Sequence, residues 1–99
     1  MFACVLVVDL RLPLTGSLKA KRATITPILE GARRRHRVAV SEVGHQDQWQ
    51  RATLVAALAG GSPGRLESAI DGVQRWLDAR FAHGARVDRY LTSLEDLAG

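Results

Sequence analysis

The sequence VAVSEVGHQDQWQRATLVAALA occupies residues 38–59 and contains two apolar segments separated by a polar one. Val38 and Val40 are spaced as on one face of a β-strand, and in residues 49–59 one face of a strand would carry Ala52, Leu54, Ala56 and Leu58. The polar residues 44–48 between them suffice for a tight connection but are too few for a helix. This stretch therefore predicts a β-hairpin.

Before the hairpin, the sequence predicts a strand and a helix. Residues 2–12 alternate between the two sides of a strand, and Ser17 is a suitable N-terminal cap for a helix. Pro27 lies inside that helix and points away from its apolar side, and its missing backbone donor is predicted to kink the helix. The apolar side consists of Leu18, Ile25, Ile28, Leu29 and Ala32.

After the hairpin, the sequence predicts a second helix and a last strand. Ser62 can cap this helix, and Pro63 suits its first turn. Apolar residues continue at helical spacing, and Gly84 is predicted to end the helix. Residues 87–94 form the predicted last strand.

The predicted order β-α-β-β-α-β is that of the α+β ferredoxin-like fold. The rules for chain connections place four antiparallel strands in the order 4-1-3-2, with two helices on one face of the sheet. We expect a single domain over residues 1–94 and a frayed tail over residues 95–99.

Composition limits the class of protein. The chain has 99 residues, of which 46% are hydrophobic and 24% are charged, as expected for one globular domain. Its longest apolar runs, residues 2–8 and 54–59, are far shorter than the roughly 20 residues of a membrane span. No basic leader precedes the first strand, so we expect a cytoplasmic protein without a membrane partner. Cys4 is the only cysteine, which excludes an internal disulfide.

Positive charge is concentrated in the first half of the chain. Residues 1–51 contain nine Lys or Arg and four Asp or Glu, a net charge of +5, whereas residues 52–99 contain five and six, a net charge of −1. This asymmetry favours an anionic partner such as RNA, because Lys and Arg release counterions from a phosphate backbone. The predicted RNA-facing residues are Lys19, Lys21, Arg22, Arg33, Arg34, Arg37 and Arg51.

The hairpin contains four candidates for recognition: Glu42, His45, Asp47 and Trp49. The first three are also side-chain types that serve in acid–base catalysis or metal binding. A structural role is the alternative, in which Gly44 permits a positive φ, Asp47 caps the turn and Trp49 packs over the sheet edge. We predict no catalytic, metal-binding or cofactor-binding residue and no cofactor, because no complete motif for any of them is present.

The sheet face without helices would carry Val5, Val7, Val55 and Ala57 at its centre. RNA-recognition motifs stack bases on aromatic residues of the central strands, and none of these four is aromatic. An apolar patch of this kind favours contact with a second copy of the chain or with a partner protein. Homodimerisation through this face is therefore a further prediction.

Three segments form a distinctive combination: LRLP at residues 10–13, SLKAKR at 17–22 and VSEVGHQDQWQRA at 40–52. Together they resemble the YlxP-like proteins, a family of small bacterial proteins of unassigned function. The resemblance covers residues 1–94, and the last two segments in combination are far more specific than either alone. It implies a ferredoxin-like fold and no catalytic residue. Genes of the family often lie beside genes for translation initiation and ribosome maturation factors.

These observations favour a non-enzymatic cytoplasmic protein that binds RNA or a ribosomal particle through its basic first half. A homodimeric protein-interaction module without nucleic-acid contact is the first alternative. A small-molecule enzyme that uses Glu42, His45 and Asp47 is the second.

Overall fold

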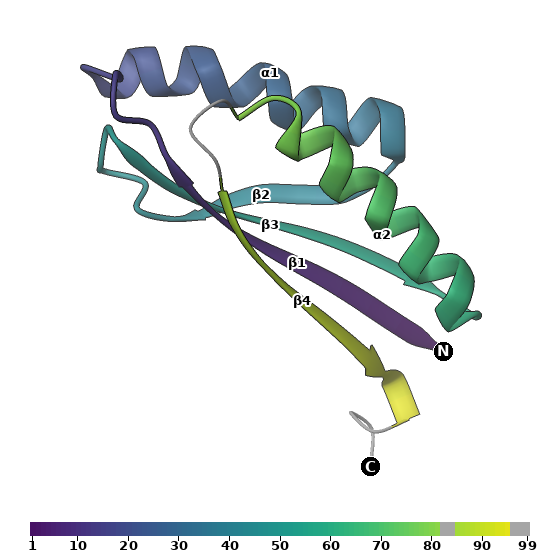
Figure 1. Ribbon diagram of the computed structural model, residues 1–99. Helices are drawn as coiled ribbons and strands as arrows, with labels where there is room; N and C mark the ends of the chain where they lie inside the picture. Colours follow the sequence, from purple (N-terminus) through teal and green to yellow (C-terminus); the bar gives the residue numbers. More distant parts are fainter. Residues whose placement is uncertain (82–84, 96–99) are drawn as a thin grey trace.

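The computed structural model describes residues 1–81 and 85–95, which form four strands and two helices (Figure 1). In chain order the elements are β1 (Phe2–Arg11), α1 (Leu18–His36), β2 (Ala39–Gly44), β3 (Arg51–Gly60), α2 (Pro63–Asp78) and β4 (Ala85–Ser93). This is the predicted order. Residues 96–99 of the predicted frayed tail lie outside the described residues, whereas the carboxylate of Glu95 lies 3.3 Å from the amino group of Met1.

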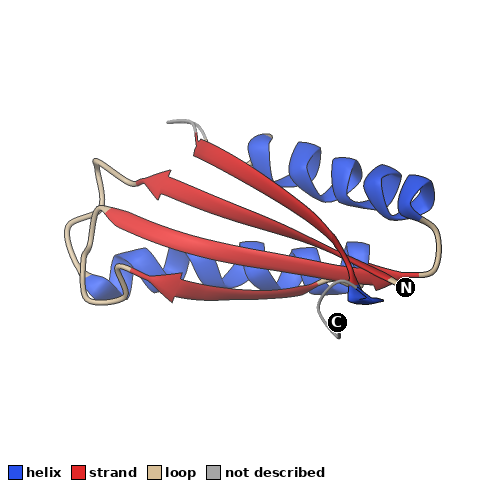
Figure 2. Cartoon of the chain, turned by 90° about the horizontal axis from the view of Figure 1, so that it is seen from below, coloured by secondary structure: helices blue, strands red, loops and turns tan. Residues whose placement is uncertain are grey.

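The four strands form one antiparallel sheet in the order β2-β3-β1-β4. This order is 4-1-3-2 counted from the other edge, so the predicted topology is confirmed. Both helices lie on the same face of the sheet and leave the opposite face open (Figure 2). The predicted ferredoxin-like architecture is therefore present.

The core lies between the sheet and the helix layer. Every second residue of the two central strands faces the helices, because side chains alternate between the faces of a sheet. The buried residues of these strands are Cys4, Leu6, Val8, Leu10, Ala52, Leu54 and Ala56. Those of α2 recur at helical spacing and are Leu66, Ile70, Val73 and Leu77. Each fully buried Leu, Ile or Val side chain contributes about 1.5–3 kcal/mol to this core.

Both helices begin at the predicted serine caps. The Ser17 hydroxyl accepts a hydrogen bond from the Ala20 amide at 3.0 Å, and the Ser62 hydroxyl accepts one from the Arg65 amide at 3.4 Å. Each cap satisfies one of the amides that the first turn of a helix leaves without a partner. Pro27 lies inside α1, which continues without interruption to His36, and it is exposed, as its position around the helix predicted.

Several element boundaries differ from the prediction, and two of the differences bear on the site or on the end of α2. The strand predicted from Trp49 begins at Arg51, and before it the carbonyl of Gln48 accepts a hydrogen bond from the Lys21 side chain rather than from a neighbouring strand. Trp49 therefore belongs to the turn. The helix predicted to reach Gly84 ends at Asp78, where the backbone tightens into short-range bonds, and Gly84 itself lies outside the described residues.

Candidate functional site

A buried lysine anchors the turn between β2 and β3. Lys21 is only 1% exposed, and its ammonium donates to the carbonyl oxygens of His45 at 2.7 Å and Gln48 at 2.8 Å. Its Nζ also lies 2.6 Å from Oε2 of Glu42. This oxygen is buried, and the ammonium of Lys21 is the charged partner that compensates it. The start of α1 and the hairpin therefore form one packed unit.

The burial of Lys21 corrects its assignment to an RNA-facing surface. An ammonium that is enclosed by two carbonyls and a carboxylate has no free face for a phosphate. Burying such a charge is tolerated only where partners replace its hydration, which is what the hairpin provides. The function of Lys21 is to hold the turn.

The backbone of the turn differs from the prediction at Gly44. His45, not Gly44, takes the left-handed backbone conformation, with φ of 57°. Gly44 is needed for space instead, since a Cβ there would lie 3.0 Å from both Cβ and Oγ1 of Thr53. The pairing of β2 with β3 shifts between Glu42 and Gly44, as in a β-bulge.

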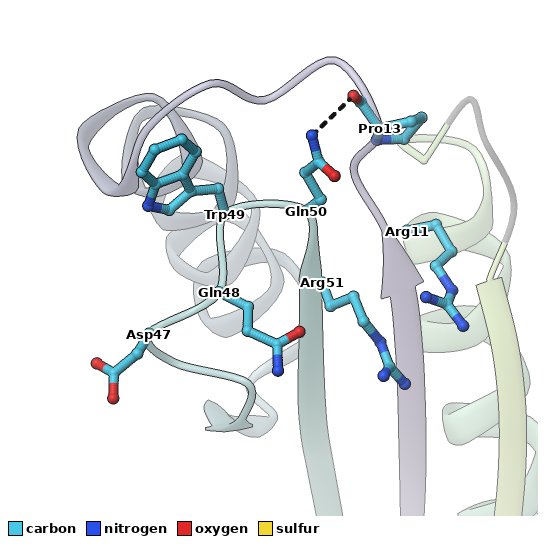
Figure 3. A pocket seen from close by; sticks show the side chains of 7 residues that line it. All are labelled: Arg11, Pro13, Asp47, Gln48, Trp49, Gln50 and Arg51. Carbon is cyan, nitrogen blue, oxygen red and sulfur yellow. Dashed lines mark hydrogen bonds between the residues drawn. The ribbon is translucent and has the colours of Figure 1, made fainter.

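Glu42, His45 and Asp47 do not line a common cavity. Glu42 is paired with Lys21, and Asp47 is exposed and points away from the neighbouring strands (Figure 3). No hydrogen bond of the Asp47 side chain was found in the described part of the chain, so the turn is held by backbone groups, Lys21 and Gln46 rather than by an aspartate cap. Within residues 1–81 and 85–95, no three His, Cys, Asp or Glu side chains are placed to hold a metal ion.

A hollow of 550 Å³ lies beside this turn. Two of its lining residues are arginines on the central strands, and the remainder come from the turn and the end of β1: the full set is Arg11, Pro13, Asp47, Gln48, Trp49, Gln50 and Arg51. Arg11 and Arg51 are direct partners in the pairing of β1 with β3, and both extend toward the same side (Figure 3). Trp49 is 51% exposed. The lining thus includes two arginines, an exposed tryptophan whose ring points away from the two guanidinium groups, and the carboxylate of Asp47 (Figure 3).

Arg11 and Arg51 carry charges that no carboxylate in residues 1–81 or 85–95 pairs with directly. Among the described residues, neither has a carboxylate within 4 Å. The nearest acidic position along this face of β1 is Asp9, whose carboxylate accepts a hydrogen bond from Thr53 at 2.8 Å. Like charges placed directly opposite each other across two strands destabilise a sheet. An anion bound between Arg11 and Arg51 would relieve that repulsion.

The remaining predicted cations do not form one surface. Lys19 and Arg22 are exposed near the start of α1, at the same end of the molecule as the hairpin. Arg34 and Arg37 are exposed near the other end of this helix, which is about 27 Å long at 1.5 Å per residue. Arg33 donates to the Val40 carbonyl at 2.6 Å. Arg51, unlike all of these, faces the open side of the sheet.

Arg11 is the site residue that the sequence interpretation missed. It lies within the predicted first strand, and nothing in its local sequence marks it as functional. The signal lies in the strand pairing, which sets Arg11 opposite Arg51. We define the hairpin end as the end of the molecule that carries Arg11 and Arg51 on the open face of the sheet, Trp49 in the turn, and Lys19 and Arg22 at the start of α1.

The predicted apolar residues of the open face are direct neighbours. Val5 pairs with Ala57 and Val7 pairs with Val55 across the two central strands. All four are partly exposed. Tyr90, the partner of Val5 on β4, is 58% exposed. These five residues form one patch, which we call the open-face patch.

No helix in residues 1–81 or 85–95 is both long and apolar enough to cross a membrane. In comparisons with solved structures, the chain superimposes on the de novo designed protein Foldit4 with a TM-score of 0.57 and 14% identity, covering 93% of this chain and 96% of that one. A second de novo designed protein, with a ferredoxin fold, gives a TM-score of 0.56 at 9% identity, covering 94% and 86%. These likenesses support the fold.

The sequence comparisons place the chain in a family. The uncharacterized protein YlxP of Bacillus subtilis (strain 168) is 36% identical over 64 residues, which cover 65% of this chain and 70% of that protein. Residues 3–89 match the model of a family described as protein of unknown function (DUF503). Because this match spans nearly all of the domain, the chain belongs to the DUF503 family, in agreement with its YlxP-like segments.

Proposed function

We propose that this is a non-enzymatic cytoplasmic protein that binds RNA, alone or within a ribosomal particle, through the hairpin end. The observation that carries the proposal is the pair Arg11 and Arg51, which face the same side without a carboxylate partner among the described residues. Guanidinium groups form bidentate, charge-assisted hydrogen bonds with phosphate oxygens. Two of them on adjacent strands can hold the backbone of one RNA strand.

The rest of the hairpin end supports the same chemistry. Trp49 offers an exposed indole, and base–indole stacking is the common means of holding unpaired bases. Lys19 and Arg22 add positive charge at the start of α1. The gene neighbourhood implied by the family resemblance, beside translation and ribosome maturation factors, is consistent with an RNA partner.

The proposal predicts that an Arg11→Gln/Arg51→Gln variant binds single-stranded RNA about tenfold or more weakly, because each arginine contributes a charge-assisted contact. The measurement is fluorescence anisotropy with a labelled oligonucleotide over a series of salt concentrations. Loss of two phosphate contacts should reduce the slope of log affinity against log salt by about 1.4. A Trp49→Ala variant should weaken binding by about 1–3 kcal/mol without changing that slope.

The matched control is Arg65→Gln/Arg75→Gln, which removes the same charge from exposed positions on α2. It should retain most of the wild-type affinity. If the wild-type protein has no RNA affinity that falls with added salt, or if the control loses as much as the hairpin variant, the hairpin end is not an RNA site.

Self-association through the open-face patch is a second candidate function. It is favoured by the contiguity of Val5, Val7, Val55 and Ala57 in the strand register, with Tyr90 beside them. A two-fold dimer would cover the patch of each copy with the same patch of the other. We expect light scattering to give a dimer mass for the wild-type chain and a monomer mass for a Val55→Lys variant with an unchanged circular dichroism spectrum. A wild-type monomer at high concentration would contradict this candidate.

A further inference from the structure

A second group of arginines lies on the helix layer, away from the hairpin end. A hollow of 370 Å³ lies where α1 meets the end of α2, and its lining residues are Gly31, Arg34, Arg35, Trp76 and Arg80. Three of the five are cations and none is acidic. Glu30 is adjacent in sequence, but within the described part of the chain it makes no ion pair shorter than 4 Å. This helix-layer hollow therefore has an unbalanced positive charge.

The hollow is constructed around the indole of Trp76. A Cβ at Gly31 would lie 2.7 Å from Cη2 of Trp76, so only glycine lets the ring approach α1 this closely. The Arg80 guanidinium lies 3.6 Å from the centroid of the Trp76 ring and donates a hydrogen bond to the Trp76 carbonyl at 2.9 Å. A cation–π contact and a hydrogen bond together fix Arg80 without using a carboxylate. Its remaining donors stay available.

The surroundings of His36 reflect the positive charge of the helix-layer hollow. Its ring packs edge-on against Trp76, with 5.9 Å between centroids. Burial lowers the pKa of His36 below its usual value, and the charges of Arg35 and Arg80 lower it further. The positive charges of both arginines thus disfavour protonation of the same imidazole. An anion held between them would oppose their effect.

We propose that the helix-layer hollow binds the phosphate group of a small phosphorylated ligand, at a site separate from the hairpin end. Arg34, Arg35 and Arg80 can surround one phosphate, and Arg80 is already held in place, so it loses little freedom on binding. The volume of 370 Å³ falls within the range of about 300–1,000 Å³ typical of small-molecule sites. Arg11 and Arg51 lie on the other side of the sheet and cannot reach the same group.

The test follows the ring signals of His36 by NMR during titration with inorganic phosphate and with adenosine monophosphate, at constant ionic strength. The signals are assigned by comparison with a His36→Gln variant. We expect saturable shifts and a higher His36 pKa in the bound state, because the anion offsets Arg35 and Arg80. In an Arg80→Gln variant the affinity should fall about tenfold or more, whereas Arg65→Gln, a distant arginine on α2, should bind as the wild type does.

The outcomes separate this site from the RNA proposal. Saturation by either small ligand, lost in Arg80→Gln and kept in Arg65→Gln, supports the hollow as a phosphate site. Absence of saturation, or equal loss in both variants, overturns it. If only an RNA oligonucleotide shifts the His36 signals, the hollow is part of an RNA surface and the small-ligand site is also overturned. RNA affinity of the Arg11→Gln/Arg51→Gln variant reports on the hairpin end independently of these results.

Discussion

Replacing Lys21 with alanine should lower the free energy of unfolding by about 3–5 kcal/mol, the cost of removing one partner from a buried ion pair. The variant would leave a buried oxygen of Glu42 without its compensating charge and would remove a donor from the carbonyls of His45 and Gln48. Because a domain of this size is stable by about 5–15 kcal/mol, this single change should bring it close to unfolding. Urea denaturation followed by circular dichroism measures the loss.

The control is Lys19→Ala, which removes the same charge from an exposed position two residues earlier in α1 and should change stability by no more than about 0.5 kcal/mol. Glu42→Gln should cost less than Lys21→Ala, because the ammonium keeps both of its carbonyl acceptors. Equal losses in Lys19→Ala and Lys21→Ala would show that the lysine does not hold the hairpin.

Replacing Pro27 with alanine should raise the free energy of unfolding by about 3 kcal/mol, the difference between the two residues inside a helix. Alanine restores an amide donor for the carbonyl of Ala23, four residues earlier, and removes the collision of the proline ring with that carbonyl. Pro27 is exposed, so the change sacrifices little packing. Thermal unfolding measured in parallel with the wild-type chain reports the gain.

Thr26→Ala is the matched comparison for this variant, since it changes the adjacent exposed residue of the same helix to the same residue. Its effect should stay within about 0.7 kcal/mol, the range of ordinary helix propensities. If Pro27→Ala is no more stable than Thr26→Ala, the proline does not destabilise α1 as this prediction states.

The hairpin shows which features of the site the sequence patterns predicted and which they did not. They predicted a turn rich in polar residues and placed Glu42, His45, Asp47 and Trp49 in or beside it, but not how the turn is held. The sequence position of Lys21 did indicate that its side chain could be buried. Lys21 follows Leu18 by three residues and precedes Ile25 by four, a spacing that places it on the apolar side of α1. Only its charge argued against burial.

Arg11 and Arg51 show the opposite case. They are 40 positions apart in the sequence, and each is an ordinary charged residue at the end of a strand. Neither arginine by itself indicates a site, because their meeting depends on the pairing register of β1 with β3. That register is set by all the residue pairs of the two strands together. The hollow between α1 and α2 likewise depends on the fit of Gly31 against Trp76, which neither helix reveals alone.

The sequence by itself determined the order of strands and helices, the serine caps of both helices and the sheet topology. These features depend on interactions between residues a few positions apart and on general rules for connecting strands. Tertiary structure alone decided that Lys21 is buried while Lys19 is exposed, and that two arginines meet at one end of the sheet. The physical reason is that the free energy of a buried or unpaired charge depends on its partners in space, and those partners come from distant parts of the chain.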